Sequence, residues 1–184
     1  GGGLHVLVNN AGITRDMLAM RLKDEDWDAV LDTNLKAVFR MSRAVMRTMM
    51  KQRYGRIINI TSVVGASGNP GQSNYAAAKA GIAGLTLVQA AELARYGITV
   101  NCLAPAARTS MTEGAMPELV KKPESGFDVW DPLNVASIVV WLGSPLSAHV
   151  TGRCFEAKGG EISVADGWHT GAIRDKGARW QPAE

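Results

Sequence analysis

Residues 73–81 read S-N-Y-A-A-A-K-A-G, and they begin an alanine-rich pattern that predicts a helix over residues 75–96. Gly97 follows at a position that favours a helix C-terminus. Because residues four apart share one face of a helix, Tyr75 and Lys79 are expected to point the same way, one turn apart. The small residues beside them leave space for a second backbone or for a flat ligand.

A phenol and an ammonium group held one helical turn apart can form an acid–base pair. A free phenol, with a pKa of about 10, is a poor base at neutral pH. A cation about 4 Å away, at an effective dielectric constant of about 20, contributes about 4 kcal/mol, or about three pKa units. We therefore expect Lys79 to lower the pKa of Tyr75 toward neutral pH, where acid–base catalysis is most efficient. Taken alone, the motif is better explained as a surface pair, so its surroundings decide.

Short apolar runs alternate with helical patterns on both sides of this stretch, which predicts an α/β fold with a parallel sheet covered on both faces. A strand ending at Pro105, a flexible loop over residues 111–131 and a polar C-terminal tail over residues 161–184 complete the prediction. The predicted strands are residues 4–8, 56–61, 98–103 and 153–157, and the predicted helices are residues 24–33, 35–51, 75–96 and 132–142.

Composition and charge exclude several classes of protein. The chain has 184 residues and a formal charge of +3, which is too small to argue for nucleic acid, and its length suits one domain over residues 1–184. No apolar run approaches the roughly 18 residues that span a membrane, and no secretory leader opens the chain. Three scattered histidines give no metal-ligand spacing. Cys102 and Cys154 lie in apolar runs, which favours buried thiols in the cytoplasm over a disulfide framework.

Four further segments surround the Tyr75 motif in a fixed order: N-N-A-G at residues 9–12, Asn34 in D-T-N-L, Ser62 at the end of R-I-I-N-I-T-S, and N-C-L-A-P at residues 101–105. Ser62 follows a predicted strand, at the carboxyl edge where ligands bind in open parallel sheets. This combination resembles the short-chain dehydrogenase/reductase family over nearly the whole chain. The resemblance implies a Rossmann-like fold.

The resemblance also implies hydride-transfer chemistry with NADP or NAD. Tyr75 is then the general acid for reduction and the base for oxidation, and Lys79 lowers its pKa and holds the nicotinamide ribose. Ser62 orients the substrate carbonyl, and Asn34 holds a proton-relay water.

Six further positions correspond to cofactor-contacting positions of the family. The family usually has glycine after the proline and a later threonine that contacts the carboxamide, but this chain has Ala106 and Ser110 at those positions. The implied cofactor residues outside the catalytic group are Asn9, Ala11, Gly12, Pro105, Ala106 and Ser110.

Two parts of the chain resemble different branches of the family. Residues 9–84 resemble bacterial 3-oxoacyl-[acyl-carrier-protein] reductases, and Arg53 matches a carrier-docking position of those enzymes. Arg40, Arg43, Arg47 and Lys51 add a basic stripe that suits an acidic carrier protein or, equally, an ordinary solvated helix face. From residue 85 onward the chain resembles actinobacterial hydroxyacyl-CoA or hydroxysteroid dehydrogenases. Both branches interconvert 3-oxoacyl and 3-hydroxyacyl thioesters.

The glycine-rich phosphate turn of the family, T-G-x-x-x-G-x-G, does not occur in this sequence. We therefore expect a chain that enters the fold at its fourth strand, with the N-terminal part missing. The alternative is a catalytically inactive fragment that only associates with full-length subunits. The predicted helices at residues 35–51 and 75–96 correspond to the dimer interface of the family's homotetramer, so a homo-oligomer is expected.

Overall fold

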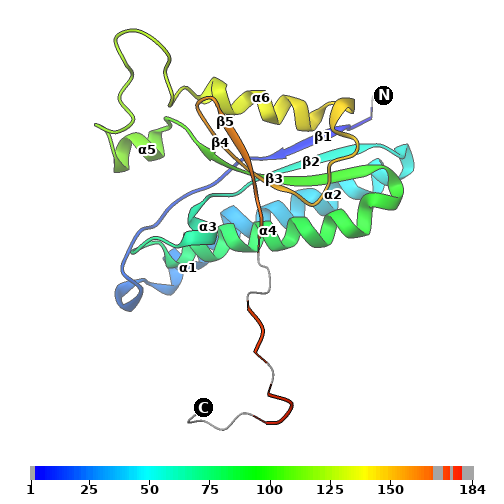
Figure 1. The fold of residues 1–184 in the computed structure, drawn as a ribbon, viewed down its shortest axis with the longest axis horizontal. Helices are drawn as coiled ribbons and strands as arrows, with labels where there is room; N and C mark the ends of the chain where they lie inside the picture. The colour runs from blue at the N-terminus through cyan, green and yellow to red at the C-terminus, as the bar shows by residue number, and fades with distance from the viewer. Residues whose placement is uncertain (1–2, 168–171, 175, 180–184) are drawn as a thin grey trace.

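Five strands form one sheet at the centre of the molecule, as Figure 1 shows for the computed structural model, which describes residues 3–167, 172–174 and 176–179. Their order in the sheet follows their order in the sequence, the first four are parallel, and the fifth is antiparallel to the fourth. The predicted α/β fold with a parallel sheet is confirmed. The strands are β1 (Val6–Asn9), β2 (Gly55–Ile60), β3 (Ile98–Ala106), β4 (Cys154–Lys158) and β5 (Glu161–Ala165).

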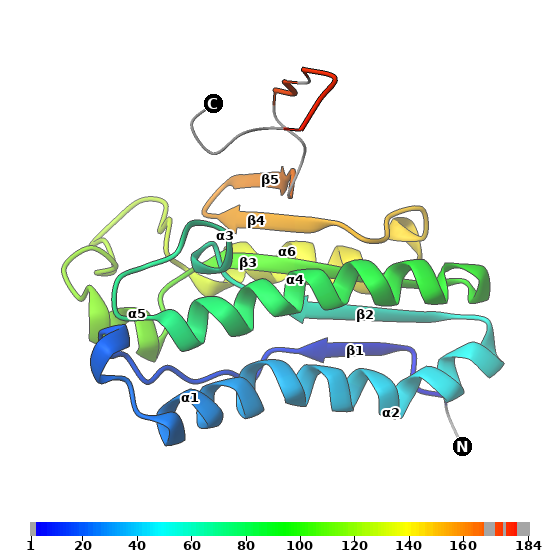
Figure 2. The same cartoon turned by 90° about the horizontal axis from the view of Figure 1, so that it is seen from below.

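Helices cover both faces of the sheet, as predicted. Figures 1 and 2 show α2 and α4 side by side on one face and α6 on the other. In the described part of the chain, no helix is both long and apolar enough to cross a membrane. The helices and helical turns are η1 (Ala19–Arg21), α1 (Asp24–Leu31), η2 (Asp32–Lys36), α2 (Ala37–Gln52), α3 (Val64–Ser67), α4 (Ser73–Leu93), η3 (Ala94–Tyr96), α5 (Ser110–Ala115), α6 (Pro132–Gly143) and η4 (Pro145–Ser147).

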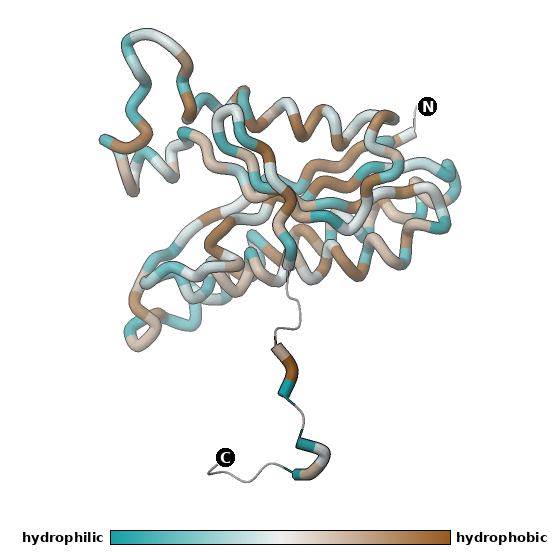
Figure 3. Tube along the Cα trace, viewed as in Figure 1, coloured by the Kyte–Doolittle hydropathy of each residue, from teal (hydrophilic) through white to brown (hydrophobic). Residues whose placement is uncertain are grey.

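The alternation of side chains along the strands creates two apolar layers. Ile57 and Val100 face α2 and α4, whereas Ile58 and Leu103 face α6. Burying each such side chain stabilises the fold by about 1.5–3 kcal/mol. Figure 3 shows the apolar residues concentrated along the strands and at recurring positions of the helices.

Strand β3 continues past Pro105, where the sequence predicted its end. The Leu103 carbonyl accepts a hydrogen bond from the Thr61 nitrogen on the β2 side. Pro105, two residues later, presents its nitrogen to the same side, but β2 has already ended at Ile60. The proline therefore removes no ladder hydrogen bond, and the strand can extend through it.

Residues 161–165 form a strand, so the prediction of a polar tail from residue 161 was wrong there. The turn at Gly159 and Gly160 folds the chain back onto β4. Ile162 and Val164 lie on the same face as α6, but α6 packs only against β2, β3 and β4, so both side chains stay about half exposed. Other parts of the predicted tail, residues 168–171, 175 and 180–184, lie outside the described residues.

The predicted flexible loop over residues 111–131 also contains regular structure. Helix α5 begins behind Thr109, whose hydroxyl accepts a hydrogen bond from the Thr112 nitrogen, while the Thr112 side chain caps the Thr109 backbone. This reciprocal pair satisfies the free donors at the start of a short helix. The capping threonines are visible in the sequence, but the apolar residues of this segment have only a weak helical periodicity. The sequence therefore did not predict the helix.

Candidate active site

The segment that follows β2 meets the first turns of α4 at the carboxyl end of the strand (Figures 1 and 2). Ser62 lies in this segment, two residues after β2 ends. Two hydrogen bonds fasten α4 there: Lys79 Nζ donates to the Ile60 carbonyl over 2.8 Å, and the Thr61 hydroxyl donates to the Lys79 carbonyl over 2.6 Å. The helix is thus bound to the strand that carries Ser62 by the residue predicted to assist Tyr75.

Tyr75 and Lys79 share one face of α4, as their spacing predicts. Lys79 Nζ lies 5.5 Å from the centre of the Tyr75 ring. The Ser62 hydroxyl lies close enough to the phenol to lower its pKa by hydrogen bonding. The structure therefore brings Ser62, Tyr75 and Lys79 together, although they come from two elements that are 13 residues apart in the sequence.

The expected lowering of the tyrosine pKa by Lys79 is not observed. Burial raises the pKa of Tyr75 above 10, the Ser62 hydroxyl lowers it in part, and the Asp16 carboxylate raises it further. Burial also lowers the pKa of Lys79 from its usual 10.5 to about 8. Desolvation disfavours both the phenolate form of Tyr75 and the ammonium form of Lys79. The lysine nitrogen also donates one of its hydrogen bonds to the Ile60 carbonyl. The spacing of the pair could be predicted from the sequence, but its burial could not.

Asn34 lies next to Lys79 and completes this group. A Cβ added to Gly12 would stand 3.3 Å from Asn34 Oδ1 and 3.7 Å from Lys79 Nζ, so the glycine at that position keeps the space between them open. Both ends of the fully buried Asn34 amide bind the backbone of Ile13, over 2.8 and 2.9 Å. A water relay at Asn34 therefore stays a proposal.

Between the predicted helices over residues 24–33 and 35–51, the structure has a π-helical turn, η2, that joins α1 to α2 without interruption. Such turns are rare and occur mostly at functional sites. Asn34 lies in the middle of this turn, where its side chain reaches the segment after β1. A single π-helical turn does not change the apolar periodicity of the sequence enough to be recognised, so the sequence did not predict it.

Two residues that the sequence reasoning missed hold the group of Ser62, Tyr75 and Lys79 in place. Asn74, fully buried, accepts a hydrogen bond from the Tyr75 nitrogen and donates to the carbonyls of Arg15 and Asp26. A Cβ on Gly65 would lie 2.7 Å from the Ala80 nitrogen, so this glycine allows α3 to touch the backbone of α4. The sequence signals for these two residues were the Asn-Tyr pair in S-N-Y and the glycine in S-V-V-G. Neither signal indicates which residues Asn74 or Gly65 contacts.

Asn9 lies at the end of β1, and its side chain forms hydrogen bonds that stabilise the fold. Its buried amide donates to the Ser42 hydroxyl over 3.2 Å and to Asn59 Oδ1 over 2.8 Å, and Asn59 in turn donates to the Thr86 hydroxyl. This chain of polar groups ties the sheet to α2 and α4. Ala11 and Gly12 follow at the carboxyl edge and are exposed.

The remaining predicted residues lie in two places. Pro105 and Ala106 end β3, and Ser110 begins α5 on the α6 side of the carboxyl edge (Figure 1). Arg53 lies at the opposite edge, past the C-terminus of α2, with a left-handed backbone (φ 56°). Its guanidinium lies 5.5 Å from the centre of the Tyr96 ring. No group of three or more potential metal ligands occurs among the described residues.

Comparison with known proteins supplies relatives for this arrangement. The family model for short chain dehydrogenases matches residues 1–119. Over 169 residues the chain is 50% identical to the 3-oxoacyl-[acyl-carrier-protein] reductase FabG of Vibrio cholerae and 48% identical to that of Escherichia coli, covering 89% of this chain and 68% of each relative. The crystal structure of a short chain dehydrogenase from Mycobacterium avium matches with a TM-score of 0.83 and 49% identity, covering 99% of this chain and 61% of the other.

Proposed function

Because the chain belongs to the short-chain dehydrogenase family, we propose that it is an NAD(P)-dependent oxidoreductase that interconverts 3-oxoacyl and 3-hydroxyacyl thioesters. The observation that carries the proposal is the meeting of Ser62, Tyr75 and Lys79 at the carboxyl edge of the sheet. The named reductases among its relatives favour the 3-oxoacyl-[acyl-carrier-protein] reductase type. The substrate is then an acyl thioester of a carrier protein or of coenzyme A. The thiols Cys102 and Cys154 are free, which supports a cytoplasmic location.

The residues at this edge fit a nicotinamide cofactor. Gly12 is exposed and lies beside Asn34 and Lys79, and its lack of a side chain allows a cofactor to approach the backbone closely. We assign Tyr75 and Lys79 to the nicotinamide ribose, and Asn9, Ala11, Gly12, Pro105, Ala106 and Ser110 to the rest of the cofactor. When bound, the cofactor would supply the hydride in reduction and accept it in oxidation. The choice between NAD and NADP is left to measurement.

The described residues account for the proton and for the orientation of the substrate. Ser62 holds the carbonyl oxygen of the substrate, and Tyr75 donates its phenolic proton to that oxygen as the alcohol forms. Because the pKa of Tyr75 is raised, the phenol keeps its proton at neutral pH. A protonated tyrosine is the form that reduction requires, whereas oxidation requires the phenolate.

A basic groove supports docking of an acidic carrier protein. The groove has a volume of about 530 Å³, with Met46, Met50 and Tyr96 among its lining residues and Arg43, Arg47 and Lys51 beside them. Arg53 and Arg95 both lie against the Tyr96 ring, at 5.5 and 4.8 Å. Tyr96 thus holds two arginines beside the groove.

The groove lies far from Tyr75 within one chain. Tyr96 follows Tyr75 by 21 residues along α4 and η3, which corresponds to about 30 Å. A two-fold axis perpendicular to α4 would place the Tyr96 end of one copy beside the Tyr75 end of the other. We therefore propose that a carrier docked on one subunit serves the site of its neighbour.

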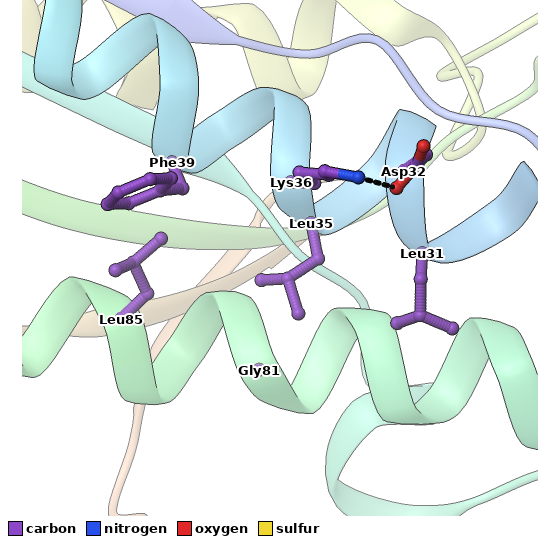
Figure 4. A pocket seen from close by; sticks show the side chains of 7 residues that line it. All are labelled: Leu31, Asp32, Leu35, Lys36, Phe39, Gly81 and Leu85. Carbon is purple, nitrogen blue, oxygen red and sulfur yellow. Dashed lines mark hydrogen bonds and ion pairs between the residues drawn. The ribbon is translucent and has the colours of Figure 1, made fainter. Parts of the chain in front are cut away.

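An apolar groove between α4 and the continuous helix formed by α1, η2 and α2 supports such an assembly. Figure 4 shows Leu31, Leu35 and Leu85 pointing into it, with Phe39 at one end and the Asp32–Lys36 ion pair at its rim. Its volume is about 430 Å³, and Phe39 is 41% exposed. Gly81 forms part of its floor and brings the helices close. We propose that a second copy of the chain covers this face, as in the dimers and tetramers of the family.

One observation keeps a second enzymatic function open. The segment after Pro105 carries Ala106 and Arg108, which resemble actinobacterial dehydrogenases, and a mycobacterial short chain dehydrogenase is 49% identical. A (3R)-hydroxyacyl-CoA or hydroxysteroid dehydrogenase is therefore the alternative activity. The other alternative, a fragment that only associates with full-length subunits, has its support in the coverage of 68% and 61% of the relatives.

Titration with NADPH and NADH, followed by turnover of acetoacetyl-CoA and of the matching carrier-protein thioester, separates these functions. A reductase binds NADPH and oxidises it with either thioester, and neutral substitutions at Arg47, Lys51 and Arg53 raise KM for the carrier thioester alone. Preference for NAD and 3-hydroxyacyl-CoA would establish the dehydrogenase. A folded protein without affinity for either nucleotide would leave only association.

A further inference from the structure

One ion pair anchors both ends of the segment that joins β3 to α6. Arg108 follows β3, and Asp128 lies four residues before α6. The guanidinium of Arg108 binds both carboxylate oxygens of Asp128, and Nη1 also donates to the Val120 carbonyl over 2.7 Å. The two side chains are only 15% and 11% exposed. In the other ion pairs of the described residues, every side chain is more than 40% exposed. The pair of Arg108 and Asp128 is therefore less screened by solvent than the others.

Backbone contacts extend this anchor to the elements on both sides. The Arg108 nitrogen donates to the Trp130 carbonyl over 2.7 Å, and the Trp130 nitrogen donates to Asp128 Oδ1 over 3.1 Å. Asn134, in α6, donates to the Asp128 carbonyl over 2.8 Å. Val120, in the middle of the segment, is fully buried. The side chain and the backbone nitrogen of Arg108 together connect the beginning of residues 108–130 to their middle and their end.

The segment between these anchors presents apolar side chains to solvent. Met111, Met116, Leu119 and Phe127 are 38%, 46%, 59% and 65% exposed. Figure 1 shows α5 and the following loop beyond the carboxyl edge of the sheet, the edge where Ser62 and Tyr75 also lie. An extended apolar group held at that edge would cover such side chains, and covering them is favourable in proportion to the area removed from water.

We infer that Arg108 and Asp128 are positioning residues that set the preference of the site for the length of the acyl chain. They touch neither the reacting carbonyl nor the chain, but they hold residues 109–127 where these four side chains can pack on the carbons beyond the thioester. A short acyl group does not reach them. This inference rests on the proposed acyl-thioester function.

The ordering of the segment is tested by hydrogen exchange on the whole chain. Arg108→Gln and Asp128→Asn should speed exchange of amides 109–127 about tenfold, while amides in β2 and α4 keep their rates. Arg108→Lys, which keeps the charge but loses the planar fork, should give an intermediate rate. Lys121→Gln, the same loss of charge on an exposed residue of the segment, serves as the matched control. Unchanged exchange in both Arg108→Gln and Asp128→Asn would overturn the clamp.

The effect on the acyl chain is tested by calorimetry with acetoacetyl-CoA and 3-oxooctanoyl-CoA. Both clamp variants should weaken binding of the eight-carbon thioester about tenfold, by loss of several buried methylene groups, and leave that of the four-carbon thioester unchanged. Equal effects on both, or none on either, would overturn the role in chain length. If the parent protein binds no thioester, the proposed function and the acyl role fail together, whereas hydrogen exchange still decides whether the clamp orders the segment.

Discussion

The ammonium nitrogen of Lys79 lies 5.5 Å from the centre of the Tyr75 ring and donates a hydrogen bond to the carbonyl of Ile60, the last residue of β2. The lysine thus connects the phenol to the strand that carries Ser62. The same burial that fixes this geometry lowers the pKa of Lys79 to about 8 and raises that of Tyr75. The raised pKa means that the phenol of Tyr75, beside Lys79, keeps its proton at neutral pH.

The depressed pKa of Lys79 makes the stability of the fold depend on pH. Between pH 8 and 10.5 the unfolded chain binds more protons at this residue than the folded chain, so stability should rise with pH there. The free energy of unfolding of the parent, relative to that of Lys79→Met, should rise by up to about 1.4 kcal/mol for each pH unit in this window. Below pH 8 this difference should not change with pH. Urea denaturation at a series of pH values measures the difference. A difference that stays constant from pH 7 to 10.5 would show that Lys79 keeps its ordinary pKa.

The raised pKa of Tyr75 separates the two directions of the proposed reaction. Oxidation of 3-hydroxybutyryl-CoA needs the phenolate, so its rate should rise about tenfold for each pH unit from pH 7 to about 9.5. Reduction of acetoacetyl-CoA by the same protein should show no such rise, because the phenol is already protonated. Initial rates in both directions check the prediction. An oxidation rate that already levels off near pH 8 would mean that the tyrosine pKa is lowered in the working enzyme.

Gly65 should tolerate no side chain. A Cβ there would lie 2.7 Å from the Ala80 nitrogen and 2.8 Å from the Lys79 carbonyl carbon, and helix backbone cannot move away locally. We expect Gly65→Ala to lower stability by about 1–3 kcal/mol and to reduce activity by displacing α4. Gly114→Ala in α5, where nothing lies within 4 Å of the added atom, is the control and should be neutral or stabilising. Thermal denaturation of both variants decides, and equal melting temperatures would contradict the close approach.

Removal of the Asn34 amide should loosen the segment after β1. Asn34→Ala leaves both the nitrogen and the carbonyl of Ile13 without their partner, which should lower stability by about 1–3 kcal/mol. Asn10→Ala, at an exposed position of the same N-N-A-G segment, is the control and should change stability by less than about 0.5 kcal/mol. Chemical denaturation compares the two. Similar small losses in both would mean that the π-helical turn holds Ile13 by other means.

The parts of the site that could be predicted from the sequence are those set by local periodicity. Tyr75 and Lys79 share a face because helix geometry fixes residues four apart, and Gly97 ends its helix in the left-handed region that its position suggested (φ 73°). Ser62 reaches them because parallel strands end at one edge. None of these relationships requires knowledge of distant neighbours.

The parts that could not be predicted depend on such neighbours. The pKa of Tyr75 follows from burial, and the π-helical turn at Asn34 follows from its bonds to Ile13. Strand β5 is defined by its pairing with β4, which the five residues themselves do not indicate, so the sequence predicted a tail there. The clamp between Arg108 and Asp128 joins residues 20 apart across a stretch without periodicity.

The most direct test of the central claim, that Tyr75 is the proton donor of an acyl-thioester reductase, is turnover of acetoacetyl-CoA with NADPH by the parent and by Tyr75→Phe. The account predicts that the parent oxidises NADPH and that Tyr75→Phe keeps its fold and its nucleotide affinity but loses on the order of 10²–10⁴-fold in kcat. If Tyr75→Phe keeps most of the parent's kcat, another group donates the proton and the assignment is contradicted.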